Sequence, residues 1–306
     1  MNIPPDIMTA GWPRGLLYEG PYWSAKRRSL WWVDIVGKAV FCRDEHGSIR
    51  QYHMPEKVSA VVETADDRLL LTGQKRLLAL EPDSGHYVVA FELNEEPAGN
   101  RCNDAKCDPF GNLWFGSMDD AEEASTGALW CLTRSGQVHR FFGGVGISNT
   151  LAWDIERQRM YFGDSRLGTI FTMNYRVVDG IAELGPKELF AGPDVAVGIP
   201  DGSAVDAEGN LWNARWDGGC VICLNPDGRL IQTIDVGAKR PTSCAFAGVR
   251  LDTLVVTTAS LGLKELAPDA LDGHVLAFPV ITPGQAVAHY GGTILPKYSP
   301  AAMELP

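Results

Sequence analysis

A unit of two short apolar strands separated by a polar break recurs six times along this chain. The units begin at Leu30, Leu69, Leu113, Met160, Leu211 and Leu254. Their starts lie about 39 to 51 residues apart, which is the length of one four-stranded blade of a β-propeller. Long amphipathic helices are hard to find, whereas polar turns rich in Gly, Asp and Pro are frequent. The repeat therefore predicts an all-β fold, a six-bladed β-propeller, with residues 1–306 as a single domain.

The charge and composition narrow the range of partners. The chain carries a net charge of −11 and has a pI near 5.0, which argues against nucleic acid and anionic membranes as partners. No apolar run approaches the roughly 18 residues that span a bilayer, and the N-terminus lacks the features of a signal peptide. Seven scattered cysteines indicate reduced thiols. We therefore expect a cytoplasmic protein, a monomer or a weak homo-oligomer, with no nucleic-acid or membrane partner.

The innermost strand of each blade lines the central channel of a propeller, and the repeat gives its position. The strand that begins each unit is the second of its blade, so the innermost strand begins ten or eleven residues earlier. This count places four polar side chains at one height around the channel: Glu19, Asn103, Asn149 and Asp201. The other two blades place Val58-Ser59 and Ser243-Cys244 at this height. Four blades of six thus direct a carboxylate or an amide at one point.

Carboxylates that converge in this way repel each other, and at least one has a raised pKa unless a cation neutralises them. Carboxylate and amide oxygens are hard ligands that suit Ca²⁺, Mg²⁺ or Mn²⁺, and also an oxygen-bound Zn²⁺ or Fe²⁺. The matched positions therefore predict a site for one divalent metal ion in the channel. The alternative is that each polar residue only caps a loop.

The tripeptide Pro-Asp-Gly occurs twice, and the repeat separates the two copies. Pro200-Asp201-Gly202 begins an innermost strand, whereas Pro226-Asp227-Gly228 follows the apolar strand that ends the fifth unit. Pro-Asp-Gly is a favourable turn sequence, so Asp227 is predicted to lie in a hairpin turn. Asp201 is predicted to use the same turn geometry to direct its carboxylate into the channel.

Other acidic and aromatic residues receive structural roles. Asp34 and Asp164 follow apolar strands and are predicted to link strands, and Asp104 is expected to point away from the channel because it directly follows Asn103. The acidic stretch 119–123 is expected to be a solvated loop, with a lid over the channel as the alternative. Core positions between blades are expected for Trp31, Trp32, Trp114 and Trp212.

Motifs of several other enzyme classes are missing. There is no Gly-x-Ser-x-Gly nucleophile motif, no phosphate-binding loop and no dinucleotide-binding fingerprint. The histidines form no metal-spaced pair, and Cys220 and Cys223 would face opposite ways on a strand. Serine-triad hydrolysis and cofactor redox chemistry therefore have little support.

From about Leu17 to Val280 the chain resembles the family of regucalcin (senescence marker protein), gluconolactonase and luciferin-regenerating enzyme. The matching segments are EGPYW at Glu19, NRCNDAKCDPFGNLWFGSM at Asn100, SNTLAW at Ser148, PDGSAVDAEGNLW at Pro200 and RPTSCAFAG at Arg240. The resemblance implies a six-bladed propeller with one divalent metal ion in the channel, held by Glu19, Asn149 and Asp201. It also implies that Asn103 contacts the substrate near the metal and that Arg101 binds the substrate.

The family chemistry implies a metal-dependent lactonase, which hydrolyses a sugar lactone to the aldonic acid. The substrate would be an aldono-1,4- or 1,5-lactone such as a glucono-, xylono-, arabinono- or galactonolactone. The metal would polarise the carbonyl, and Asp201 would be both a ligand and the catalytic base that activates water. Trp216 is left open between packing and stacking on a sugar ring.

Two other functions remain as alternatives on the same propeller: a phosphotriesterase or aryl-ester hydrolase, and a calcium-binding regulatory protein. Three departures from the family pattern bear on the substrate. Thr150 and Ala247 stand where the family usually has Gly, and Ala105 stands where the family commonly has Gly. None of them removes a ligand, but all three could reshape the pocket.

Overall fold

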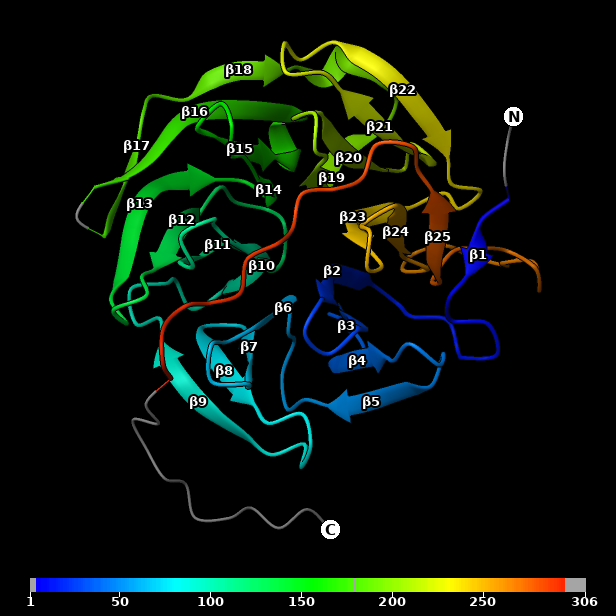
Figure 1. Ribbon diagram of the computed structural model, residues 1–306, viewed down its shortest axis with the longest axis horizontal. Coiled ribbons are helices and arrows are strands. Elements are labelled where there is room, and N and C mark those ends of the chain that lie inside the picture. Colours follow the sequence, from blue (N-terminus) through cyan, green and yellow to red (C-terminus); the bar gives the residue numbers. More distant parts are fainter. Residues whose placement is uncertain (1–3, 179, 295–306) are drawn as a thin grey trace.

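Six antiparallel sheets surround a central axis in the computed structural model, which describes residues 4–178 and 180–294 (Figure 1). Each sheet is one blade, and the chain runs through each blade from the axis outwards, since the first strands of neighbouring blades contact each other around the axis. The six-bladed β-propeller expected from the repeat is confirmed. The prediction that residues 1–306 form one domain stays a prediction, because residues 295–306 lie outside the described part.

The first three blades each have four strands. Blade 1 comprises β2 (Tyr18–Ser24), β3 (Ser29–Asp34), β4 (Ala39–Arg43) and β5 (Ile49–His53). Blade 2 comprises β6 (Ala60–Glu63), β7 (Leu69–Thr72), β8 (Arg76–Leu80) and β9 (Tyr87–Glu92). Blade 3 comprises β10 (Asn100–Cys107), β11 (Leu113–Asp119), β12 (Gly127–Leu132) and β13 (Val138–Val145).

The second half of the ring is less regular. Blade 4 comprises β14 (Ser148–Asp154), β15 (Arg159–Asp164), β16 (Thr169–Val178), β17 (Ile181–Leu184) and β18 (Glu188–Ala191), the last two both paired with β16. Blade 5 comprises β19 (Ile199–Val205), β20 (Leu211–Trp216), β21 (Cys220–Leu224) and β22 (Leu230–Asp235). Blade 6 comprises β23 (Pro241–Ala247), β24 (Thr253–Thr258), β25 (Val275–Pro279) and β1 (Asp6–Ile7). Two short 3₁₀ helices, η1 (Ser165–Leu167) and η2 (Pro193–Val195), precede β16 and β19.

The ring closes through its two ends, because the N-terminal strand β1 is the outermost strand of the last blade. Asp6 pairs with Ala277 and Ile7 pairs with Leu276. Just beyond this pairing, Thr9 Oγ1 and His274 Nδ1 lie 2.9 Å apart in a hydrogen bond. The first segment of the chain is thus held on the last blade, and no blade of the ring is left with an open side facing a gap.

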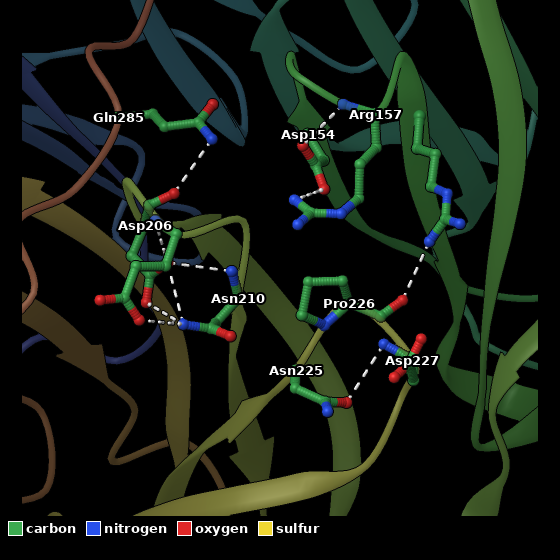
Figure 2. A network of polar contacts seen from close by, with 10 residues as sticks. Asp154, Arg157, Asp206, Asn210, Asn225, Pro226, Asp227 and Gln285 are labelled. Carbon is green, nitrogen blue, oxygen red and sulfur yellow. Dashed lines mark hydrogen bonds and ion pairs between the residues drawn. The ribbon is translucent and has the colours of Figure 1, made fainter.

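The tight turn before the second strand of blades 3 and 5 shows how the sequence shapes a blade. In Asp206-Ala-Glu-Gly-Asn210-Leu-Trp212 the Asp206 carboxylate accepts hydrogen bonds from the backbone N–H of Asn210 at 2.9 Å and from its side chain (Figure 2). It also accepts one from the indole N–H of Trp212 at 2.9 Å. Asp108 makes the same bond to Trp114 in blade 3. One buried carboxylate therefore fixes the turn and orients a core tryptophan.

The four tryptophans expected in the core are buried. Their exposed fractions are at most 3%, the values being 1% for Trp31, 0% for Trp32, 0% for Trp114 and 3% for Trp212. Trp114 packs among aromatic rings of blade 4, and Trp212 packs edge-on against Phe246 of blade 6. The large rings thus fill the wedges between blades, as the repeat predicted.

A segment near the C-terminus crosses one end of the channel, and we call residues 283–291 the strap (Figure 1). The strap bonds to the end of β19, where the amide of Gln285 donates to the carbonyl of Asp206 at 3.0 Å (Figure 2). It then reaches blades 2 and 3. There the backbone N–H of Tyr290 donates to the backbone carbonyl of Glu63, and the Tyr290 hydroxyl donates to the backbone carbonyl of Thr133. Residues 285–288 line the axial cavity together with the innermost strands. The strap therefore covers the end at which the innermost strands finish.

All seven cysteines are free thiols, which agrees with the expectation of reduced cysteines. Across the described residues, no helix has the length and apolar character needed to cross a membrane.

Two aspartates near the strap end form a matched pair for a stability test. Asp206 is 1% exposed and accepts the turn and indole hydrogen bonds, whereas Asp227 is exposed and contributes only its backbone N–H, which donates to Asn225. We expect Asp206→Ala to lower the free energy of unfolding by roughly 2–4 kcal/mol, because it leaves buried donors unpaired. Asp227→Ala should change it by about 0.5 kcal/mol or less. Chemical denaturation of both variants measures the difference, and equal effects would contradict this account.

Candidate active site

The innermost strands carry β-bulges at the level where the repeat placed the polar side chains. In each bulge two residues face one on the neighbouring strand. The bulge follows Glu19 directly in β2 and Asn149 directly in β14. In β10 it consists of Asn103 and Asp104, and in β19 of Asp201 and Gly202. A bulge interrupts the ladder and redirects side chains. These four blades therefore depart from regular pairing at one level of the channel, and β23 of blade 6 has a further register shift between Pro241 and Ser243.

The Asp201 bulge corrects the prediction that Pro200-Asp201-Gly202 is a turn. These residues lie inside β19, and Gly202 is needed because a Cβ there would lie 2.0 Å from Ser243 Oγ and 2.9 Å from Ser243 Cα. In the other copy Gly228 has a φ of +79° in the turn between β21 and β22, which confirms the hairpin turn predicted for Asp227. The two copies thus use glycine for different reasons, close packing in one and a left-handed backbone in the other.

Side chains of blades 3 and 4 form a continuous chain of hydrogen bonds at this level. Arg101 Nη1 donates to Asn103 Oδ1 at 2.6 Å, and Asn103 Nδ2 donates to Asn149 Oδ1 at 3.2 Å. Asn103 Nδ2 also donates to the backbone carbonyl of Ser148 at 2.9 Å. All three side chains are buried. The structure therefore brings together three of the five site residues predicted from the sequence.

The acidic loop is not merely solvated, because Asp120 is tied to the site. Arg101 Nε donates to Asp120 Oδ1 at 2.9 Å, and Lys57 Nζ lies 2.7 Å from both carboxylate oxygens of Asp120. Residues 121–126 are exposed, so the solvated loop expected for 119–123 is confirmed for 121–123. Asp120 thus holds Arg101 beside Asn103, while the rest of the loop faces solvent.

The other two predicted residues, Glu19 and Asp201, are close enough to affect each other's ionisation. Burial raises the pKa of Glu19 to about 8, with a further contribution from the charge of Asp104. Burial also raises the pKa of Asp201 well above its usual range, and the charges of Glu19 and Asp104 add to this. Arg101 acts in the opposite direction on both carboxyl groups. Blades 1 and 5 therefore place two mutually repelling carboxyl groups in one poorly hydrated region.

Asp104 lines the axial cavity, so the expectation that it points away from the channel is wrong. Its carboxylate accepts a hydrogen bond from the backbone N–H of Leu151 at 2.9 Å, and burial raises its pKa. The physical reason is the bulge in β10. Asn103 and Asp104 are the two bulged residues, so the strict alternation of a regular strand does not apply to them.

Asp34 and Asp164 link strands, as predicted. Asp34 accepts hydrogen bonds from the backbone N–H groups of Leu16 and Leu17 at 2.9 and 3.1 Å. Asp164 accepts equivalent bonds from Gly146 and Ile147 at 2.9 and 3.1 Å. Each aspartate thus fixes the loop that leads into the innermost strand of its own blade.

Trp216 is half-buried, and the guanidinium carbon of Arg240 lies 4.8 Å from the centre of its ring. This contact occupies one face of the indole with a cation–π interaction.

The chemistry of the predicted donors is that of ligands for a divalent cation. Glu19 and Asp201 supply carboxylate oxygens, and each has only a neighbouring glycine N–H as a hydrogen-bond partner among the described residues. The amide oxygen of Asn149 retains a free lone pair beside its bond to Asn103. Within residues 4–178 and 180–294 no three His, Cys, Asp or Glu side chains gather as a metal site. The predicted set differs from such a cluster because its third donor is an amide.

A family model described as the SMP-30/Gluconolactonase/LRE-like region matches residues 17–260. The chain belongs to this family. Among solved structures of family members, regucalcin from Agrobacterium tumefaciens, described as a calcium-binding protein, superimposes with a TM-score of 0.86 at 26% identity, covering 94% of this chain and 97% of that one. A luciferin-regenerating enzyme also superimposes with a TM-score of 0.86, at 25% identity, covering 94% of this chain and 99% of its own. The resemblance identified from the sequence motifs is thereby confirmed.

Several relatives of known name are lactonases, which are carboxylic-ester hydrolases. An L-arabinolactonase of Azospirillum brasilense is 33% identical over 92% of this chain and 94% of its own length. A pentonolactonase of Haloferax volcanii is 32% identical over 79% of this chain and 81% of its own length. Regucalcin of Gallus gallus is 32% identical over 84% of this chain and 88% of its own length.

Several residues around the candidate site were not predicted from the sequence. Lys57 and Asp120 lie in loops and Ser165 begins η1, so all three lie outside the innermost strands, at positions that counting back along the repeat does not reach. Ser165 accepts a hydrogen bond from Asn149 Nδ2 at 2.8 Å. A signal was present for Asp120 and Ser165, since each directly follows the last residue of the second strand of a blade.

The raised pKa of Glu19 predicts a pH dependence of stability in the metal-free protein. Its pKa is about 8 in the folded state against an ordinary value of 4.5, so between these values the folded chain keeps a proton that the unfolded chain releases. The free energy of unfolding should therefore fall as pH rises from about 5 to 8. Glu19→Gln removes this contribution, so its melting temperature should decrease less over the same window. Thermal unfolding of chelator-treated samples at pH 5 and pH 8 measures the two slopes, and parallel slopes would refute the prediction.

Proposed function

We propose that this protein is a metal-dependent lactonase that hydrolyses a sugar lactone, an aldono-1,4- or 1,5-lactone, to the aldonic acid. The observation that carries the proposal is the pair of interacting carboxyl groups, partly buried Glu19 and buried Asp201, beside the chain Arg101–Asn103–Asn149. Family membership and relatives named as lactonases support the reaction class.

The substrate would be held by blade 3. Arg101 is fixed by Asp120 and by Asn103, so its planar guanidinium is oriented before any ligand arrives. A polyhydroxylated lactone offers oxygen acceptors for guanidinium N–H groups, and the Asn103 amide would contact the carbonyl or ring oxygen. Preorganised donors of this kind lose little conformational entropy on binding.

Glu19, Asn149 and Asp201 would hold the divalent ion, with three oxygen donors from blades 1, 4 and 5. When bound, the ion supplies Lewis-acid polarisation of the lactone carbonyl and stabilises the negative charge that develops on it. Ca²⁺, Mg²⁺, Mn²⁺, Zn²⁺ and Fe²⁺ all accept such oxygen ligands. A relative described as a calcium-binding protein supports a divalent ion as the cofactor.

Asp201 would accept the proton that water loses as it attacks the lactone carbonyl. A general base works best when its pKa lies near the working pH, and burial moves the pKa of Asp201 in that direction from its usual acidic range. The attack forms the bond from the water oxygen to the carbonyl carbon, and opening of the ring breaks the bond from that carbon to the ring oxygen. The proton held by Asp201 then passes to the released ring oxygen, which becomes a hydroxyl group of the aldonic acid.

Asp201→Asn tests the assignment of the base. Asparagine keeps the size of the side chain and one ligand oxygen but cannot accept the proton, so we expect lactone hydrolysis to fall by at least about a hundredfold. The melting temperature should stay within a few degrees of wild type. Asp227→Asn is the matched control in the other Pro-Asp-Gly copy and should keep wild-type activity. Full activity in Asp201→Asn would rule out Asp201 as the base.

Metal removal tests the reaction itself. Acid release from a panel of 1,4- and 1,5-aldonolactones should stop after chelation and return when Ca²⁺, Mg²⁺, Mn²⁺ or Zn²⁺ is added back. A pH-stat titration measures this directly. Activity that survives exhaustive chelation would contradict metal dependence. Metal binding without hydrolysis of any lactone would instead favour a calcium-binding protein, and turnover of aryl esters alone would favour an aryl-ester hydrolase.

A further inference from the structure

Two hydroxyl groups of blade 4 hold the backbone on either side of the Asp201 carboxylate. Ser165 Oγ donates to the carbonyl of Pro200 at 2.6 Å, and Thr150 Oγ1 donates to the carbonyl of Asp201 at 2.6 Å. Both hydroxyls are buried. The bulge in β19 takes Asp201 out of regular pairing, so side chains of the neighbouring blade replace part of the backbone ladder there.

Ser165 also fixes the orientation of Asn149. Its Oγ accepts a hydrogen bond from Asn149 Nδ2 at 2.8 Å and donates its own proton to Pro200. With Nδ2 engaged in this way, Asn149 Oδ1 points to the opposite side, where Asn103 Nδ2 donates to it at 3.2 Å. One hydroxyl group thus connects two of the predicted ligands, Asn149 in blade 4 and Asp201 in blade 5.

Thr150 adopts a backbone conformation that is unfavourable for its residue type. Its φ is +60°, in the left-handed region that β-branched residues rarely occupy. The side chain is fully buried, and Asn213 Nδ2 donates to both Thr150 Oγ1 at 3.2 Å and the Asp201 carbonyl at 2.9 Å. A Cβ at position 163 would lie 2.7 Å from Thr150 Oγ1, so Gly163 provides the space for this hydroxyl.

The strain at Thr150 is therefore maintained in part by hydrogen bonds that meet at the Asp201 carbonyl. Strained residues of this kind persist only where the surrounding structure holds them, and they gather at functional sites. Thr150 directly follows Asn149, so its backbone conformation also sets the direction in which the chain leaves that residue. The same residue is consequently coupled to both oxygen donors, through its backbone to Asn149 and through its hydroxyl to Asp201.

We propose that Ser165 and Thr150 are positioning residues that fix the separation and orientation of Asn149 Oδ1 and the Asp201 carboxylate for a divalent ion. The assignment rests on the proposed function, because it presumes that these two residues are ligands. Groups that orient metal ligands usually affect metal affinity and activity by ten- to a hundredfold when they are removed. A purely structural role would instead lower thermal stability and leave metal affinity unchanged.

The experiment compares matched variants of the full-length protein. Ser165→Ala and Thr150→Val remove one hydroxyl each, Thr150→Ser keeps the hydroxyl, and Tyr290→Phe removes a buried hydroxyl that donates to the Thr133 carbonyl at the strap end. Binding of Mn²⁺ to each metal-free protein, followed by electron paramagnetic resonance, gives the dissociation constant without any use of activity. Thermal unfolding of the metal-free proteins measures the structural effect separately.

We expect the Mn²⁺ dissociation constant to rise at least about tenfold in Ser165→Ala and Thr150→Val, and to stay within about threefold of wild type in Thr150→Ser and Tyr290→Phe. At saturating Mn²⁺, kcat for lactone hydrolysis should fall in the first two variants more than KM rises. Unchanged Mn²⁺ affinity in Ser165→Ala and Thr150→Val overturns the positioning role, whatever their melting temperatures. If Ser165→Ala does not fold, Thr150→Val decides alone. If the wild type itself neither binds Mn²⁺ nor hydrolyses any lactone, the proposed function is overturned instead. The wild type alone gives this result, so the two outcomes are distinguishable.

Discussion

The pairing of β1 with β25 is the interaction on which the rest of this structure depends. A channel exists only when the six blades form a closed ring, and this short antiparallel ladder holds the N-terminal segment on the last blade, whose inner strand β23 lies against β2 of the first. Once the ring is closed, all innermost strands run in the same direction along one axis. Residues far apart in the sequence, such as Glu19 and Asp201, can then meet at one height. The site is therefore a product of topology as much as of the residues themselves.

Much of this arrangement could be predicted from the sequence because a repeat fixes the phase of every blade. Strand starts at Leu30 and Leu211, together with a constant step back to the innermost strand, were enough to place Glu19 and Asp201 at one level. The core tryptophans and the hairpin at Asp227 followed from the same count. Because the blades repeat, a position assigned in one blade predicts the equivalent position in the others.

The remaining errors arise where the chain departs from that periodicity. Bulges in β10 and β19 break the alternation of side chains, which is why Asp104 faces the cavity and why Asp201 lies within a strand rather than in a turn. Contacts that cross between blades were also beyond the sequence. Nothing in the repeat indicates that Lys57 of blade 2 bonds Asp120 of blade 3 or that the hydroxyl of Ser165 in blade 4 reaches Pro200 of blade 5. Such contacts depend on side-chain positions that only the closed ring creates.

The strap limits the side from which a small molecule can enter the channel. Residues 285–288 cover one end of the axial cavity, and Glu19 at the other end retains part of its surface in solvent. On the proposed chemistry, the lactone would reach the polar level from the end opposite the strap, where Lys57 and Arg101 share the carboxylate of Asp120. The strap and the acidic loop thus lie at opposite ends of the channel, and the acidic loop is the one in the substrate's path.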